Sequence, residues 1–136
     1  MDEEELAQSL RTLEFYKVQL QTFDQQYEYL AATISEHNRA IETMKAYKEL
    51  EEGSETLVPI GASSFLPARV FESNRAMVGI GADIVVDTNI DDAISKLQER
   101  IKEIEDAMKT IGLKYQEMAT KAAELSAKIQ ELYNQE

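Results

Sequence analysis

Few side chains in this sequence could carry out chemistry, and their spacing suits structural roles better than catalytic ones. The 136 residues include no Cys and a single His, His37, which falls on the apolar face of a helix-like segment. Neither a thiolate nucleophile nor a His/Cys zinc site can therefore be assembled. Gly79-Ile80-Gly81 begins like a nucleotide-binding loop but lacks the third glycine and the following helix. We expect a protein that is not an enzyme and uses no cofactor or metal.

The composition also limits the partners. Acidic residues number 26 against 14 basic ones, and a chain with a net charge of -12 is poorly suited to bind nucleic acid. No run of about 18 apolar residues occurs, and Met1 to Leu10 is acidic where a signal peptide would be basic and then apolar. The absence of Cys fits a reducing compartment. We expect a cytoplasmic protein with neither a membrane nor a nucleic acid as partner.

Residues 1–52 have the heptad pattern of a coiled-coil helix, with apolar residues separated by gaps of three and four. The first part of the apolar seam is expected at Leu6, Leu10, Leu13, Lys17, Leu20 and Phe23. Two gaps of three meet at Leu20, which predicts a stammer that overwinds the coil locally. The helix is expected to end near Gly53, because glycine readily adopts the left-handed conformation that closes helices.

Residues 89–136 form a second coiled-coil helix whose apolar seam runs from Ile90 to Leu132 without a break. Thr88 is expected to be the N-cap, with Asp91 in the first turn, where a carboxylate is favoured by the helix dipole. Two helices of similar length joined by a short intervening segment are expected to run antiparallel, with both chain ends together.

The intervening residues 53–88 have the pattern of β-strands. They are rich in Val, Ile, Phe and Gly, and several apolar residues alternate with period two. Gly61-Ala62-Ser63 is expected to form a turn, and Gly79 with Gly81 to divide the last run into two short strands. Two isolated hairpins are marginal in water, so we expect other subunits to cover their apolar faces.

The sequence thus predicts an α+β protein, mainly α, in which a long antiparallel two-helix coiled-coil hairpin carries two short β-hairpins at its base. The parts are coiled-coil helix 1 (1–52), a β-hairpin oligomerisation region (53–88) and coiled-coil helix 2 (89–136). Apolar residues off the seam exceed what one partner helix covers; they are Phe15, Val18, Tyr29 and Tyr133. Unpartnered apolar surface is typical of binding sites.

Three stretches resemble the α-type subunits of the prefoldin family, particularly the archaeal form. They are Gly53 to Phe65 (GSETLVPIGASSF), Val78 to Ala82 (VGIGA) and Val86 to Ile94 (VDTNIDDAI). The resemblance covers nearly the whole chain as helix, two hairpins and helix, whereas the β-type relatives have one hairpin. Pro67 departs from the non-proline residue expected in its strand, which leaves the pairing there open.

The resemblance implies a hexamer of α and β prefoldin subunits whose strands form a double β-barrel platform. Such assemblies capture unfolded polypeptides at their coiled-coil tips and deliver them to a group II chaperonin without using ATP. The residues expected by this analogy to contact clients are Leu6, Leu10, Leu13, Leu125, Ile129, Leu132 and Tyr133. Those expected to carry assembly are Val58, Ile60, Phe65, Leu66, Val70, Val78, Ile80, Ile84 and Val86.

Other interpretations stay open at this point. Any single tip residue could simply close the coil rather than bind a client. The whole chain could be a structural scaffold or a filament-forming subunit that spaces other components without binding clients. A coiled-coil arm that grips nucleic acid would need a basic stripe, whereas these helices are acidic or balanced in charge.

Overall fold

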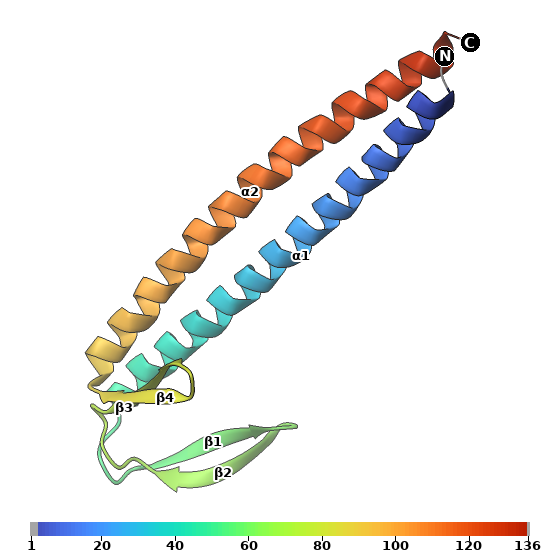
Figure 1. The fold of residues 1–136 in the computed structure, drawn as a ribbon. Helices are drawn as coiled ribbons and strands as arrows, with labels where there is room; N and C mark the ends of the chain where they lie inside the picture. The colour runs from blue at the N-terminus through green and yellow to red at the C-terminus, as the bar shows by residue number, and fades with distance from the viewer. Residues whose placement is uncertain (1–2, 136) are drawn as a thin grey trace. The chain divides into compact units, whose positions relative to one another are not determined.

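A computed structural model describes residues 3–135 as two long helices separated by two antiparallel β-hairpins (Figure 1). The elements, in chain order, are α1 (Glu3–Lys48), β1 (Glu55–Gly61), β2 (Ser64–Arg69), β3 (Ala76–Gly81), β4 (Ile84–Thr88) and α2 (Ile90–Asn134). The expected α+β class is confirmed. The described residues divide into two compact units, here called the terminal unit (3–33 and 103–135) and the hairpin unit (34–102).

In the terminal unit, the first turns of α1 lie beside the last turns of α2, and the two helices run antiparallel (Figure 1). Lys128 Nζ lies 3.8 Å from Glu5 Oε1, so the two ends of the described chain are close together, as expected. Ile129 is buried against α1, while Leu6, Leu13 and Leu125 are half-buried. A narrow apolar seam therefore holds this unit together.

The seam of α1 differs from the expected one at two positions. Ser9 is only 9% exposed, whereas Leu10 is 43% exposed. Tyr16 is half-buried, whereas Lys17 is exposed. With Ser9 and Tyr16 in the seam, gaps of three and four alternate without interruption through Leu20, and α1 is one continuous helix. The predicted stammer is therefore wrong, because a small serine occupies the seam position that hydrophobicity alone assigned to the neighbouring leucine.

The hairpin unit has a hydrophobic core of its own. It is built from the last turns of α1, the first turns of α2 and strand β3, and Ile90 is its most deeply buried side chain, at 1% exposure. The buried members are Ile41, Val78, Ile90, Ala93, Ile94, Leu97 and Ile101. Because Val78 belongs to this set, hairpin β3–β4 is packed directly against the helices.

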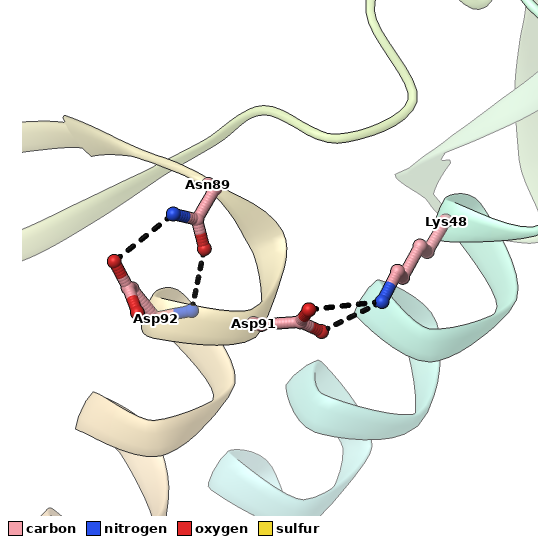
Figure 2. Close-up of polar contacts among 4 residues, drawn as sticks. All are labelled: Lys48, Asn89, Asp91 and Asp92. Carbon is pink, nitrogen blue, oxygen red and sulfur yellow. Dashed lines mark hydrogen bonds and ion pairs between the residues drawn. The ribbon is translucent and has the colours of Figure 1, made fainter.

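Two hydrogen bonds within one turn define the start of α2 (Figure 2). Asp92 N–H donates to Asn89 Oδ1 at 2.8 Å, and Asn89 Nδ2 donates to Asp92 Oδ2 at 3.0 Å. This reciprocal arrangement makes Asn89 the N-cap. The expected cap at Thr88 is wrong by one residue, because Thr88 still pairs with Ala76 in the β ladder.

The end of α1 is held by an ion pair to the start of α2. Lys48 Nζ donates to both carboxylate oxygens of Asp91, at 2.8 and 3.0 Å (Figure 2). This hydrogen bonding, with the attraction of the negative charge, raises the pKa of Lys48. α1 ends at Lys48, before the expected residue 52. Gly53 instead begins the path into β1, with a φ of 84° and its N–H donating to Val70 O.

The two hairpins share one local design. The residues Val58, Ile60, Gly61 and Ala62 recur at a constant offset as Val78, Ile80, Gly81 and Ala82. Each ladder has a bulge just before its turn, and both central residues of each turn have positive φ, between 49° and 59°. These are the dihedral signs of type I′ turns, which match the twist of paired strands. Pro67 pairs with Leu57 in β1, so the ladder of the first hairpin is continuous there.

Candidate functional site

The candidate functional surfaces are apolar and lie on the hairpins and on the terminal unit. Among residues 3–135, no cluster of His, Asp or Glu is arranged to hold a metal ion. Within the same residues, neither α1 nor α2 contains an 18-residue stretch apolar enough to cross a lipid bilayer. His37 is half-buried at its expected position in the apolar seam of α1.

Hairpin β1–β2 exposes apolar side chains on both of its faces. In its ladder Val58 pairs with Leu66, and Pro59 pairs with Phe65. Cross-strand partners share a face, whereas neighbours along a strand point to opposite faces, so Val58 and Leu66 lie opposite Phe65. Their exposed fractions are 45%, 54% and 56%, respectively. A two-stranded sheet with two open apolar faces is suited to partners on both sides.

Hairpin β3–β4 has one face packed against the helices and one face open. Val78, which is 4% exposed, pairs with the half-buried Val86 on the packed face. The other face carries Met77 and Val85, which are 64% and 58% exposed. This hairpin is therefore suited to a partner on a single face.

The nine residues predicted to carry assembly fall into two groups. The exposed group is Val58, Ile60, Phe65, Leu66, Ile80 and Ile84. The structure places Val70 and Val78 inside the hairpin unit, at 2% and 4% exposure, and leaves Val86 half-buried. Side chains buried in this way contribute first to the stability of the subunit itself.

Sequence reasoning missed four exposed apolar residues in the same region: Leu57, Phe71, Met77 and Val85. Three of them alternate with residues that it did select in the same strands. Uninterrupted apolar character along a strand is typical of burial on both faces, and this signal could have identified them.

An ion pair lies at the base of each hairpin. Arg75 Nε donates to both carboxylate oxygens of Asp87, at 2.9 and 3.0 Å, and these hydrogen bonds lower the pKa of Asp87. In the first hairpin, Arg69 Nη2 lies 3.3 Å from Glu55 Oε1, and both side chains are at least 70% exposed. The Arg75–Asp87 pair is therefore the better ordered of the two, because it is bidentate and its side chains are less exposed.

The predicted client-contact residues differ in how the structure presents them. Leu10 and Tyr133 are 43% and 50% exposed and are open to solvent. Ile129 is 6% exposed and closes the seam. The half-buried members are Leu6, Leu13, Leu125 and Leu132. The accessible part of this surface is thus smaller than the apolar sequence pattern indicated.

A groove of about 560 Å³ opens between the two helices of the terminal unit, and most of the residues that line it are polar or charged. Its lining residues are Glu5, Gln8, Ser9, Thr12, Tyr16, Lys121, Glu124, Leu125 and Lys128. Leu10 and Tyr133 are not among them. Apolar contact at these helix ends therefore comes from exposed side chains rather than from a hydrophobic pocket.

A family model and several individual proteins that match this chain all belong to one family. The family model described as prefoldin subunit matches residues 16–135. The chain is 35% identical over 130 residues to prefoldin subunit alpha of Pyrococcus horikoshii, covering 95% of this chain and 86% of the relative. It is 33% identical over 129 residues to the Nitrosopumilus maritimus subunit, with 95% and 86% covered. Over 78 residues it is 45% identical to the subunit of Methanopyrus kandleri, with 57% and 50% covered.

Two solved structures share the fold. The cryo-EM structure of filamentous PFD from Methanocaldococcus jannaschii aligns with a TM-score of 0.67 at 24% identity, covering 96% of this chain and 99% of that one. The crystal structure of the prefoldin beta subunit from Thermococcus strain KS-1 aligns with a TM-score of 0.62 at 21% identity, covering 94% and 91%. At these identities the likeness is one of fold alone.

Proposed function

Since this chain belongs to the prefoldin family, we propose that it is the α-type subunit of a hetero-hexameric holdase that works without ATP. Family membership makes it a chaperone subunit. In the proposed cycle, the subunit captures unfolded polypeptides at the helix ends of its terminal unit and delivers them to a group II chaperonin. Binding and release need no catalytic group, and the subunit is proposed to act without enzymatic activity.

The observation that carries the capture step is the exposure of Leu10 and Tyr133 on the terminal unit. Covering a large apolar side chain contributes roughly 1.5 to 3 kcal/mol, so the contacts of one subunit are weak. Several subunits presenting the same contacts to one polypeptide raise the effective concentration and retain it collectively. Weak individual contacts also allow release to the next chaperone.

Assembly is proposed to proceed through the hairpins, with strands of several subunits forming a shared β-barrel platform. Hairpin β1–β2 supports this proposal, because both of its faces expose apolar residues such as Val58 and Phe65. Pairing with β-type subunits would cover these faces and satisfy the open strand edges. The α-type subunit would thus contribute two hairpins to the platform.

The test is suppression of client aggregation by the hexamer, reconstituted with a β-type subunit and followed by light scattering of a denatured client protein. Deleting about 12 residues from each end is expected to abolish suppression, because the multivalent contacts are lost. The double substitution Leu10→Ser and Tyr133→Ser is expected to weaken it. Leu113→Ser is the matched control, because it removes a leucine of α2 that is 69% exposed.

Two results would contradict the proposal. If the end-deleted hexamer still suppresses aggregation, the helix ends are not the client surface. If the unmodified hexamer assembles but protects no client, the chain is a structural scaffold or a filament-forming subunit instead. The mass of the complex, measured on the same sample, separates a failure of assembly from a failure of capture.

A further inference from the structure

Between Phe15 and Tyr29, one face of α1 carries no charged residue. We call this face the uncharged stripe; its residues are Phe15, Val18, Gln19, Thr22, Gln25, Gln26 and Tyr29. They recur at spacings of three and four residues, so they lie on one side of the helix, and most of them face away from the seam. Phe15, Val18 and Tyr29 are 56%, 48% and 73% exposed, so this outward side of the coiled coil presents large apolar side chains to solvent.

The stripe leads into a groove on the surface of the terminal unit. The groove has a volume of about 430 Å³ and is lined by Thr22, Gln25, Gln26, Tyr29, Leu30 and, from α2, Ile111. None of these residues is charged. The second half of the stripe, from Thr22 to Tyr29, therefore borders a shallow, largely apolar depression.

The surroundings of the stripe are strongly acidic. Across the terminal unit, acidic residues outnumber basic ones by two to one. Glu14 and Glu28 lie on the adjacent face of the same helix. An apolar depression inside a negative field attracts ligands that combine apolar and positive groups, and it repels acidic ones.

We propose that the uncharged stripe docks an apolar segment of a non-native polypeptide that carries net positive charge. This inference rests on the proposed function and deepens it, because it names the class of client segment and adds a surface beyond the helix ends. A second copy of the same terminal unit is disfavoured as occupant by repulsion between two acidic surfaces.

The glutamines of the stripe suit an unfolded chain in particular. A glutamine amide offers both donors and an acceptor, so it can bond the main-chain N–H and C=O groups that an unfolded segment leaves unpaired. Gln25 and Gln26 are exposed, whereas the Thr22 hydroxyl already donates to Val18 O at 3.1 Å. Recognition through main-chain groups would require no specific client sequence beyond apolar and basic character.

The experiment compares two fluorescent peptides binding to the reconstituted hexamer, measured by fluorescence anisotropy. Both peptides share one apolar core; one is flanked by lysines and the other by glutamates. The lysine-flanked peptide is expected to bind about tenfold more tightly at low salt, and the preference is expected to shrink as salt rises. Equal binding of the two peptides would overturn the proposed charge selectivity.

Single substitutions locate the surface. Gln25→Lys is expected to weaken binding of the lysine-flanked peptide about threefold. Gln98→Lys is the matched control, because it introduces the same charge at an exposed glutamine of α2 in the hairpin unit, away from the stripe. If both variants weaken binding equally, the effect comes from overall charge and the stripe is not the site.

The apolar part is tested by Phe15→Ala with Tyr29→Ala, which is expected to weaken binding of the lysine-flanked peptide about tenfold. Leu113→Ala serves as the control. If this double variant binds normally while deletion of the helix ends abolishes client protection, the stripe proposal fails and the proposed function stands. If neither change affects capture, both proposals fail.

Discussion

Hairpins β1–β2 and β3–β4 have the same turn, the same bulge and the same apolar repeat, yet they are stabilised in different ways. Val78 is 4% exposed within the core of the hairpin unit, whereas its counterpart Val58 is 45% exposed. Likewise, Val86 is half-buried and its counterpart Leu66 is exposed. Local structure is therefore not what separates a stabilising hairpin from an interaction surface. The neighbours that cover its face decide which of the two it becomes.

The largest expected effect contrasts Val78→Asp with Val58→Asp. The first places an unpaired carboxylate in the core and is expected to lower the free energy of unfolding by about 3 kcal/mol or more. The second is expected to change it by less than about 0.5 kcal/mol, because the site is exposed, while preventing assembly with the β-type subunit. Urea denaturation of the isolated chain and the mass of the complex measure the two effects.

Because Val78→Asp could abolish folding altogether, Val78→Ala provides a milder version. Loss of two buried methyl groups is expected to cost about 1.5 kcal/mol, whereas Val58→Ala is expected to cost almost nothing in the isolated chain. Equal costs at the two positions would show that the first hairpin is as strongly integrated into the subunit core as the second.

A smaller effect is expected at the turns. Ala62 and Ala82 have φ values of 52° and 49°, a conformation that glycine adopts without strain. Ala82→Gly is expected to raise the free energy of unfolding by about 0.5 kcal/mol, net of the greater freedom of glycine in the unfolded chain. Ala62→Gly is expected to leave global stability unchanged and to slow amide exchange only within β1 and β2, because this hairpin opens locally.

Denaturant unfolding and hydrogen exchange, measured on both turn variants, provide the readout. A stabilisation by Ala62→Gly equal to that by Ala82→Gly would contradict the proposed difference in coupling to the core.

The smallest expected effect concerns pH and the ion pairs at the hairpin bases. Arg75 lowers the pKa of Asp87 in the folded state, so this pair stabilises the fold above the pKa of an unfolded aspartate. That contribution is lost as the pH falls below about 4 and through the lower folded pKa. Arg75→Gln is expected to return the Asp87 pKa toward its ordinary value, as measured by NMR titration of the carboxyl group.

Arg69→Gln, in the first hairpin, is the control and is expected to leave the Asp87 titration unchanged. An unchanged Asp87 pKa in the Arg75→Gln protein would show that the pair is too mobile in solution to shift this pKa or to stabilise the fold.

Much of the fold could be predicted from the sequence because its signals are periodic. The seam of α2 depends on repeated apolar residues, and Ile90, Ile94 and Ile101 are buried as expected. The errors occurred where the prediction had to choose between two neighbouring residues from their residue types alone. Ser9 took the seam position assigned to Leu10, and Asn89 took the cap assigned to Thr88. In both cases packing or strand pairing outweighed the intrinsic preference of the neighbouring residue.

The candidate surfaces were predicted less completely, because exposure is a property of neighbours. The pattern that selected Val58 selected Val78 equally well, although the structure exposes only the first. Leu10 and Ile129 were both selected as client contacts, yet one is open to solvent and the other closes the seam. Sequence reasoning did select Phe15, Val18 and Tyr29 as surplus apolar residues, since no partner helix could cover positions so far from the seam.

By itself, the sequence determined which segments are helices and strands, where the chain turns, and which family the chain resembles, since these depend on periodicity and on local backbone preferences. Only the tertiary structure decided which apolar residues form a core and which remain open to a partner. The physical reason is that burial requires a second surface, and whether that surface lies within this chain depends on how its elements pack together.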